Sequence, residues 1–260
     1  MQFIQSYYTD IGVKRKTNQD SLALIKADTD FGEVLLAVMC DGMGGHQSGE
    51  LASKTIVVKF EKWFKTEFPV LLYKGVDESI LKECWSRLIE ESNSLLVKYG
   101  KEKGVELGST LTAFLFIADR YYAVHVGDSR GYEISEDAIN QITRDHSLLA
   151  DAVRKGIMTE EEASKDSRKN ILLECVGITD NVKVDFYSGN IKEKHTYLLC
   201  SDGFWHFLDI EDYTHYLSGE RIEDNKMLRM HLNFLVETVK QRGEKDNISV
   251  IGVIPLQNGV

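Results

Sequence analysis

Residues 35–45, LLAVMCDGMGG, join an apolar run to a glycine-rich turn that opens with an aspartate. Three further segments share this construction: residues 123–128 (AVHVGD), 197–203 (YLLCSDG) and, in reverse order, 246–253 (DNISVIGV). Apolar runs of this length, with β-branched residues and turn residues beside them, predict buried strands. A carboxylate at the end of a strand points into the space beyond the sheet, where several can converge. Carboxylate, carbonyl and water oxygens are the ligands of Mg²⁺ and Mn²⁺.

Each of these aspartates, taken alone, also fits an ordinary turn. Asp-Gly is common in hairpins, because glycine accepts a positive φ and aspartate hydrogen-bonds its own backbone. The neighbouring residues favour a functional site instead. Residues 41–46 (DGMGGH) are too rich in glycine for a simple two-residue turn, and Asp128 lies within VGDSR.

Composition limits the class of protein. The 260 residues suffice for one large domain, 1–260, that needs no disulfide or structural metal. The four cysteines include no Cys-x-x-Cys pair, so we expect reduced thiols and no zinc site. The formal net charge of −10 argues against nucleic acid as a partner. It does not exclude a phosphorylated substrate, because bound cations can invert the local field.

The first residues and the hydropathy pattern predict no signal peptide and no membrane span. The first residues lack the basic and apolar regions of a signal peptide. No apolar run approaches the roughly 18 residues that a membrane span needs. We therefore expect a cytoplasmic protein without membrane contact.

The order of the expected elements is α+β, with two packed sheets and helices outside them. A polar, helical segment at 147–165 is the only stretch that looks peripheral. Strands are predicted at about 2–9, 20–27, 33–40, 111–117, 121–126, 131–134, 139–143, 182–187, 195–200 and 247–254. Helices are predicted from about 48, from about 77 to 100 and from about 224 to 242.

Short blocks in a fixed order identify a family. They are RKTNQD (15–20), DGMGG (41–45), GST (108–110), VGDSR (126–130), DHS (145–147), SDG (201–203) and DN (246–247). Together they resemble the metal-dependent Ser/Thr protein phosphatases of type 2C, in their bacterial form. The resemblance implies a four-layer sandwich of two mainly antiparallel sheets flanked by helices, with metals between the sheets at one end.

The resemblance also implies a set of metal ligands for two Mn²⁺ or Mg²⁺ ions. Asp41 would bridge the ions and Gly42 would offer its backbone carbonyl. Asp202 and Asp246 would complete the protein ligands. Asp128 matches the position that helps to hold a third, weaker ion in bacterial members.

Other residues would support these ligands or bind substrate. Arg15 has the family position for the phosphate clamp, although a solvated loop charge is the alternative. Asp20 would accept from metal-bound water, and Asn247 would lie just behind the ligands. Gln19 stands where many relatives carry Glu, which leaves the affinity of the second ion open.

Three further features bear on the chemistry. Met43 occupies the position at which some relatives carry a general-acid His, so the leaving-group proton needs another source. His46 and His146 are interpreted as hydrogen-bonding residues and His125 as a core histidine. Residues 147–170 correspond to the family's mobile flap, which governs substrate access; a solvated surface helix pair is the alternative.

The function implied is hydrolysis of phosphoserine and phosphothreonine in proteins, by a monomeric signal-transduction enzyme whose substrates include a Ser/Thr kinase. Two alternatives remain. A non-catalytic binding module on the same fold should have lost a metal aspartate, and none is lost here. A small-molecule phosphomonoesterase would share all of the chemistry.

Overall fold

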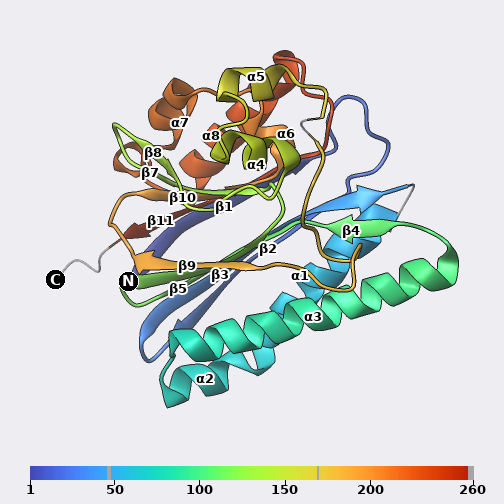
Figure 1. The fold of residues 1–260 in the computed structure, drawn as a ribbon. Helices are drawn as coiled ribbons and strands as arrows, with labels where there is room; N and C mark the ends of the chain where they lie inside the picture. Colours follow the sequence, from blue (N-terminus) through green and yellow to red (C-terminus); the bar gives the residue numbers. More distant parts are fainter. Residues whose placement is uncertain (46–47, 169, 257–260) are drawn as a thin grey trace.

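In the computed structural model, which describes residues 1–45, 48–168 and 170–256, two β-sheets lie face to face with helices on their outer sides (Figure 1). The strands are β1 (Gln2–Asp10), β2 (Asp20–Thr29), β3 (Gly32–Gly44), β4 (Leu107–Ser109), β5 (Leu111–Ile117), β6 (Arg120–Val126), β7 (Arg130–Ile134), β8 (Ile139–Gln141), β9 (Asp185–Asn190), β10 (Thr196–Cys200) and β11 (Ile248–Leu256). The helices are α1 (Ser48–Thr66), α2 (Phe68–Lys74), α3 (Glu78–Lys103), α4 (Leu148–Arg154), α5 (Glu160–Lys165), α6 (Asp202–Trp205), α7 (Ile210–Leu217) and α8 (Asn225–Gln241), with a 3₁₀ turn at Gly219–Arg221.

Both sheets are antiparallel. The first has the order β1-β11-β10-β7-β8, and the second has the order β2-β3-β5-β6-β9, with β4 paired to β3. Helices α1, α2 and α3 cover the outer face of the second sheet, and α7 and α8 cover that of the first (Figure 1). This arrangement confirms the predicted α+β sandwich of four layers.

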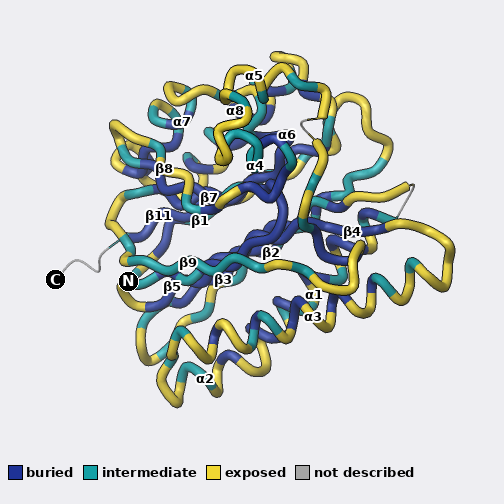
Figure 2. The backbone as a smooth tube through the Cα atoms, viewed as in Figure 1, coloured by how far each residue is buried: buried dark blue, intermediate teal, exposed yellow. Residues whose placement is uncertain are grey.

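The central strand β3 explains why the sandwich has two kinds of interior. Successive side chains of a strand point to opposite faces. Leu35, Ala37 and Met39 therefore pack between the sheets, whereas Leu36 and Val38 pack against the helices. Figure 2 shows the buried backbone concentrated along these inner strands. A strand buried on both faces has no polar alternation, which is why residues 35–40 form an unbroken apolar run.

The long helices have clear sequence causes. Asp77 caps α3 by accepting a hydrogen bond from the Ser79 amide at 2.7 Å, and Gly104 ends the helix in a left-handed conformation, with a φ of 66°. The apolar stripe of α1 is buried, and its Trp63 meets Trp85 of α3 edge to face, with the ring centres 5.8 Å apart. Both tryptophans belong to the core between the helices and the second sheet, whereas Ile80 and Leu95 of α3 are exposed.

The structure corrects several boundaries. The strand predicted at 182–187 is β9, at Asp185–Asn190. Its position is set by pairing with β6 and not by the composition of the segment itself. The strand predicted at 139–143 ends at Gln141. Helices α2, α6 and α7 were not predicted; they are short, and short helices take their stability from packing more than from propensity.

All four cysteines are free, and three of them are buried. Among the described residues, none of the helices combines the length and the apolar composition that a membrane span requires.

Candidate metal centre

The four predicted aspartates come together at one end of the sandwich. Asp41 lies near the end of β3, Asp128 follows β6, Asp202 opens α6 directly after β10, and Asp246 precedes β11. Asp41 lies within electrostatic reach of the other three. Segments that are up to about 200 residues apart in the chain are thus joined at one site, as expected when strands of two packed sheets end at the same edge.

A fifth carboxylate, Asp20, completes the cluster. It lies opposite Asp41 in the pairing of β2 with β3. Its Oδ2 accepts a hydrogen bond from the Ser201 hydroxyl at 3.0 Å. Asp20 therefore links β2 to the turn that carries Asp202.

The electrostatics of the cluster are unfavourable without added positive charge. Burial, followed by repulsion from the neighbouring carboxylates, raises the pKa of Asp41 well above its usual value and raises that of Asp20 to about 7. The same two causes raise the pKa of Asp128 and of Asp202. Oδ1 of Asp20 and Oδ1 of Asp202 are buried and have no hydrogen-bond partner among the described residues. Buried carboxylates in this state require protons or cations.

Gly42 lies where only glycine fits. A Cβ at this position would lie 2.1 Å from the Gly49 carbonyl oxygen and 2.6 Å from that of Gln19. Gly49, at the start of α1, is equally constrained, because a Cβ there would lie 2.7 Å from the Gly42 oxygen. The two glycines leave the Gly42 carbonyl free of side chains. Gly49 was not recognised in the sequence, and its Ser-Gly-Glu context gives no signal for it.

Asn247 anchors the loop between β1 and β2. Its Nδ2 donates to the carbonyl oxygens of Ile11 and Thr17, at 2.9 and 3.1 Å, and its Oδ1 accepts from the Gln19 amide at 2.8 Å. The Gln19 side chain donates to the Gly44 carbonyl at 3.3 Å. The structure thus places Asn247 and Gln19 beside the cluster, with Asn247 fixing the loop that carries Arg15.

Arg15 points at the carboxylates and not into open solvent. Its Nη2 donates to Oδ2 of Asp246 at 2.5 Å, and its side chain is 49% exposed. It also lines a cavity of about 510 Å³ together with Lys14, Asp202 and Asp246. A cationic, half-exposed side chain between a cavity and an acidic cluster is suited to an anionic ligand.

A network of paired charges borders the cluster. Trp205 donates its indole N–H to the Asp128 carbonyl at 3.2 Å, and the Arg130 guanidinium lies 3.3 Å from the centre of the Trp205 ring. Arg130 also donates to both oxygens of Asp145, at 2.7–3.1 Å. The sequence motifs contained Arg130 and Asp145, but their pairing was not predicted, since it depends on how β7 meets the loop after β8.

The histidines and Met43 have separate positions. His125 is fully buried and bonds to the Thr112 hydroxyl at 2.9 Å and the Gly127 carbonyl at 3.0 Å, which agrees with a core histidine. His146 pairs with Asp185 at 3.1 Å. Met43 is 36% exposed near the end of β3. His46 lies outside the described residues.

The donor set fits hard divalent cations. Every predicted ligand offers oxygen, from carboxylates or from the Gly42 carbonyl, which excludes a thiolate or imidazole site. Within residues 1–45, 48–168 and 170–256, no group of three or more His, Cys, Asp or Glu side chains is placed so that these side chains alone could hold a metal ion. Mg²⁺-type ions keep several of their waters when they bind to a protein. Carboxylates that lie close together, two of them with an unpartnered oxygen, therefore fit hydrated ions.

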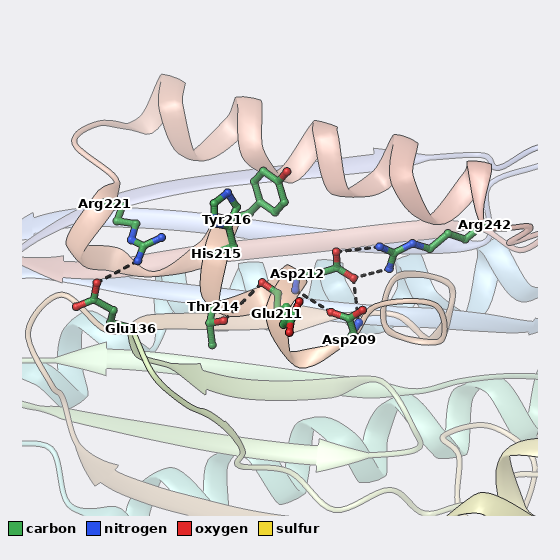
Figure 3. A pocket seen from close by; sticks show the side chains of 9 residues that line it. All are labelled: Glu136, Asp209, Glu211, Asp212, Thr214, His215, Tyr216, Arg221 and Arg242. Carbon is green, nitrogen blue, oxygen red and sulfur yellow. Dashed lines mark hydrogen bonds and ion pairs between the residues drawn. The ribbon is translucent and has the colours of Figure 1, made fainter.

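Another hollow, of about 580 Å³, lies beside α7 and contains none of the predicted site residues (Figure 3). Its two arginines are already paired: Arg242 bonds to Asp212, and Arg221 bonds to Glu136 at 3.1 Å. Asp209 and Asp212 cap the first turn of α7 reciprocally. These contacts stabilise a helix end and indicate no catalytic centre.

Comparison with known proteins gives a consistent result. A family model described as "Protein phosphatase 2C" matches residues 13–249. The chain is 30% identical over 249 residues to the serine/threonine phosphatase stp of Listeria innocua, covering 94% of this chain and 93% of that protein. It is 29% identical over 251 residues to the protein phosphatase PhpP of Streptococcus pneumoniae, with 94% of both chains covered.

Solved structures show the same similarity. The serine/threonine phosphatase of S. agalactiae superposes with a TM-score of 0.83 and 30% identity, over 98% of this chain and all of that one. The catalytic domain of the serine threonine protein phosphatase PstP, solved in complex with two manganese ions, gives a TM-score of 0.78 and 27% identity, with 98% of this chain and 100% of that one covered.

Proposed function

The chain belongs to the protein phosphatase 2C family, and we propose that the aspartate cluster is the site at which it acts as a metal-dependent phosphoprotein phosphatase. The observation that carries this assignment is the convergence of five carboxylates, of which Asp20, Asp128 and Asp202 are buried and two have an unpartnered oxygen. Related proteins are named as serine/threonine phosphatases, which favours phosphoserine and phosphothreonine as substrates and favours an enzyme over a binding module.

The proposed ligands are Asp41, the Gly42 carbonyl, Asp202 and Asp246, for two Mn²⁺ ions as in the manganese-bound relative. When bound, the two cations supply the positive charge that polarises the phosphate and lowers the pKa of a water molecule. Mg²⁺ as the ion used, and a third ion near Asp128, are further parts of the proposal.

The chain's own residues have separate tasks in this scheme. Asp20 would accept a hydrogen bond from metal-bound water through its unpartnered Oδ1. Gln19 and Asn247 hold the loop that carries Arg15 against the strand ends.

Arg15 binds the substrate phosphate. The Nη2 of Arg15 donates one hydrogen bond to Asp246, whereas a guanidinium carries five N–H donors. Donors therefore remain for phosphate oxygens. Met43 cannot supply a proton to the leaving oxygen, so we assign that role to water.

The whole chain is proposed to form one phosphatase domain, 1–260, in which residues 147–170 are the flap. In the structure this segment holds the short helices α4 and α5. A monomeric state, a Ser/Thr kinase among the substrates and a cytoplasmic location stay predictions.

Hydrolysis of a phosphopeptide with and without Mn²⁺ tests the proposal. Activity should vanish in EDTA and return with Mn²⁺ or Mg²⁺, and full activity in chelator would contradict it. A substrate panel separates the small-molecule alternative: that enzyme would prefer metabolite phosphomonoesters to phosphopeptides. Calorimetry of Asp128→Asn tests the third ion, because two ions should still bind; loss of all binding would show that Asp128 is misassigned.

A further inference from the structure

A second cavity adjoins the acidic centre on the side of α4 and α5. It has a volume of about 750 Å³, within the range of about 300–1,000 Å³ that is usual for ligand pockets. Leu149 and Val153 of α4 form one wall, and Trp205 of α6 forms another. The cavity thus separates the proposed flap from the body of the sandwich.

The charges that line this cavity are not equally available. Arg130 is committed to Asp145 and to the Trp205 ring. Arg154 donates to the Asp145 carbonyl at 3.0 Å and pairs with Asp151 at 3.2 Å. Both side chains are therefore fixed by partners of this chain.

Arg144 differs from both. Its backbone amide donates to the Tyr187 hydroxyl at 3.0 Å, but its exposed guanidinium has no hydrogen bond or ion pair with any described residue. The lining has three arginines against two carboxylates, Asp145 and Glu160, in a chain whose formal net charge is −10. A free cation beside an apolar wall suits a ligand that has both an acidic and an apolar group.

The two cavities meet at His206, which lines both of them. The smaller one contains Arg15, Asp202 and Asp246. A peptide whose phosphoserine lies at Arg15 therefore has a path past His206 into the larger cavity.

We propose that the cavity between α4, α5 and Trp205 is a subsite for the residues that flank the phosphorylated residue, and that it selects an apolar side chain together with an acidic one that pairs with Arg144. This inference rests on the proposed phosphatase function and adds a sequence preference to it. The apolar residue lies against Leu149 and Val153, and the acidic residue remains at the rim.

The test compares phosphoserine peptides with p-nitrophenyl phosphate, which is too small to reach the subsite. The Glu peptide carries Leu and Glu next to the phosphoserine, and it is made in two versions, with this pair before or after the phosphoserine. In the matched comparison peptides, Ala or Lys replaces Glu. The parent enzyme should have a higher kcat/KM for the Glu peptide than for the Lys peptide. In Arg144→Glu, the ratio of kcat/KM for the Glu peptide to kcat/KM for the aryl ester should fall by about tenfold, the effect of one charge-assisted contact.

Two further variants make the result specific. Arg144→Lys should restore most of the ratio, because it restores the charge. Lys62→Glu, which makes the same charge change on exposed α1, should leave the ratio as in the parent. Equal rates for the Glu and Lys peptides in an active parent enzyme would overturn the subsite and leave the phosphatase assignment intact. A parent enzyme that hydrolyses no phosphopeptide would overturn both.

Discussion

Two groups of buried charges lie side by side at one end of this sandwich, and they are built on opposite principles. Around Asp145, every charge has a partner: Arg130 binds it with two nitrogens, and Gln141 donates to it at 2.7 Å. Around Asp41, carboxylates face carboxylates, and Arg15 is the cation that the structure pairs with one of them.

The difference separates stability from function. A buried ion pair that is fully hydrogen-bonded fixes the geometry of its surroundings, and losing one partner is costly. A buried cluster of like charges destabilises the protein that contains it until a ligand neutralises it. The Arg130 network thus fixes the geometry at this end of the sandwich. The aspartate cluster, in contrast, gains stability when a cationic ligand binds to it.

Asp41→Asn should have the largest effect on activity without a loss of stability. The kcat for a phosphopeptide should fall by at least about a thousandfold, or about 4 kcal/mol, because a proposed metal ligand would lose its charge. In EDTA, the free energy of unfolding should not fall, since repulsion within the cluster decreases. Urea denaturation measures this, with the exposed Asp180→Asn as control. A marked loss of stability in EDTA would show that Asp41 belongs to the structural group.

Arg130→Met should reverse this pattern. It leaves Asp145, which is almost fully buried, without its cation, so the free energy of unfolding should fall by about 3 kcal/mol. Arg168→Met, which removes the cation of an exposed ion pair with Asp166, is the matched control and should have a much smaller effect. Equal effects of the two substitutions would refute the contrast between the groups.

Arg15→Ala tests the residue that connects the cluster to the substrate. The KM for a phosphopeptide should rise by an amount equivalent to about 2 kcal/mol, as for a charged hydrogen bond, and calorimetry should still detect bound Mn²⁺. Lys14→Ala, in the same cavity, should change KM less. Unchanged kinetics in Arg15→Ala would return Arg15 to the role of a solvated loop charge.

The pH dependence of stability in chelator should be the smallest effect. The pKa of Asp20 is raised to about 7 in the folded protein, whereas the unfolded chain has its usual value near 4. Folded protein therefore holds a proton that the unfolded chain has lost, and stability decreases as the pH rises through 7. The free energy of unfolding should be about 1 kcal/mol higher at pH 6 than at pH 8. Thermal denaturation checks this, and Asp20→Asn should reduce the difference, because Asp41 and Asp128, whose pKa values are also raised, still contribute to it.

Much of the fold and of the aspartate cluster could be predicted from the sequence, but not all of it. The aspartates were recognisable because each stands beside an apolar run that can form a buried strand. Each predicted strand has a counterpart in the structure, whereas the short strand β4 was not predicted. β9 was displaced by three residues because its neighbour β6 determines where it pairs.

The missed parts depend on distance along the chain. Arg15 and Asp246 are 231 positions apart, and no local pattern predicts their contact. Asp145 and Arg130 stand in known motifs, but the stacking of Arg130 on Trp205 follows from the packing of α6. The unpartnered oxygens of Asp20 and Asp202 are likewise properties of the packed state.

The position of β11 has a consequence for the order of events during synthesis. This strand follows all the other strands of the two sheets in sequence, and it lies between β1 and β10, pairing with both. A nascent chain that lacks it has a gap in the middle of one sheet, and it also lacks Asp246 and Asn247. Strand β1 must therefore remain unpaired until β11 has left the ribosome, and pairings of such high contact order form slowly. The acidic centre thus forms only after synthesis reaches β11.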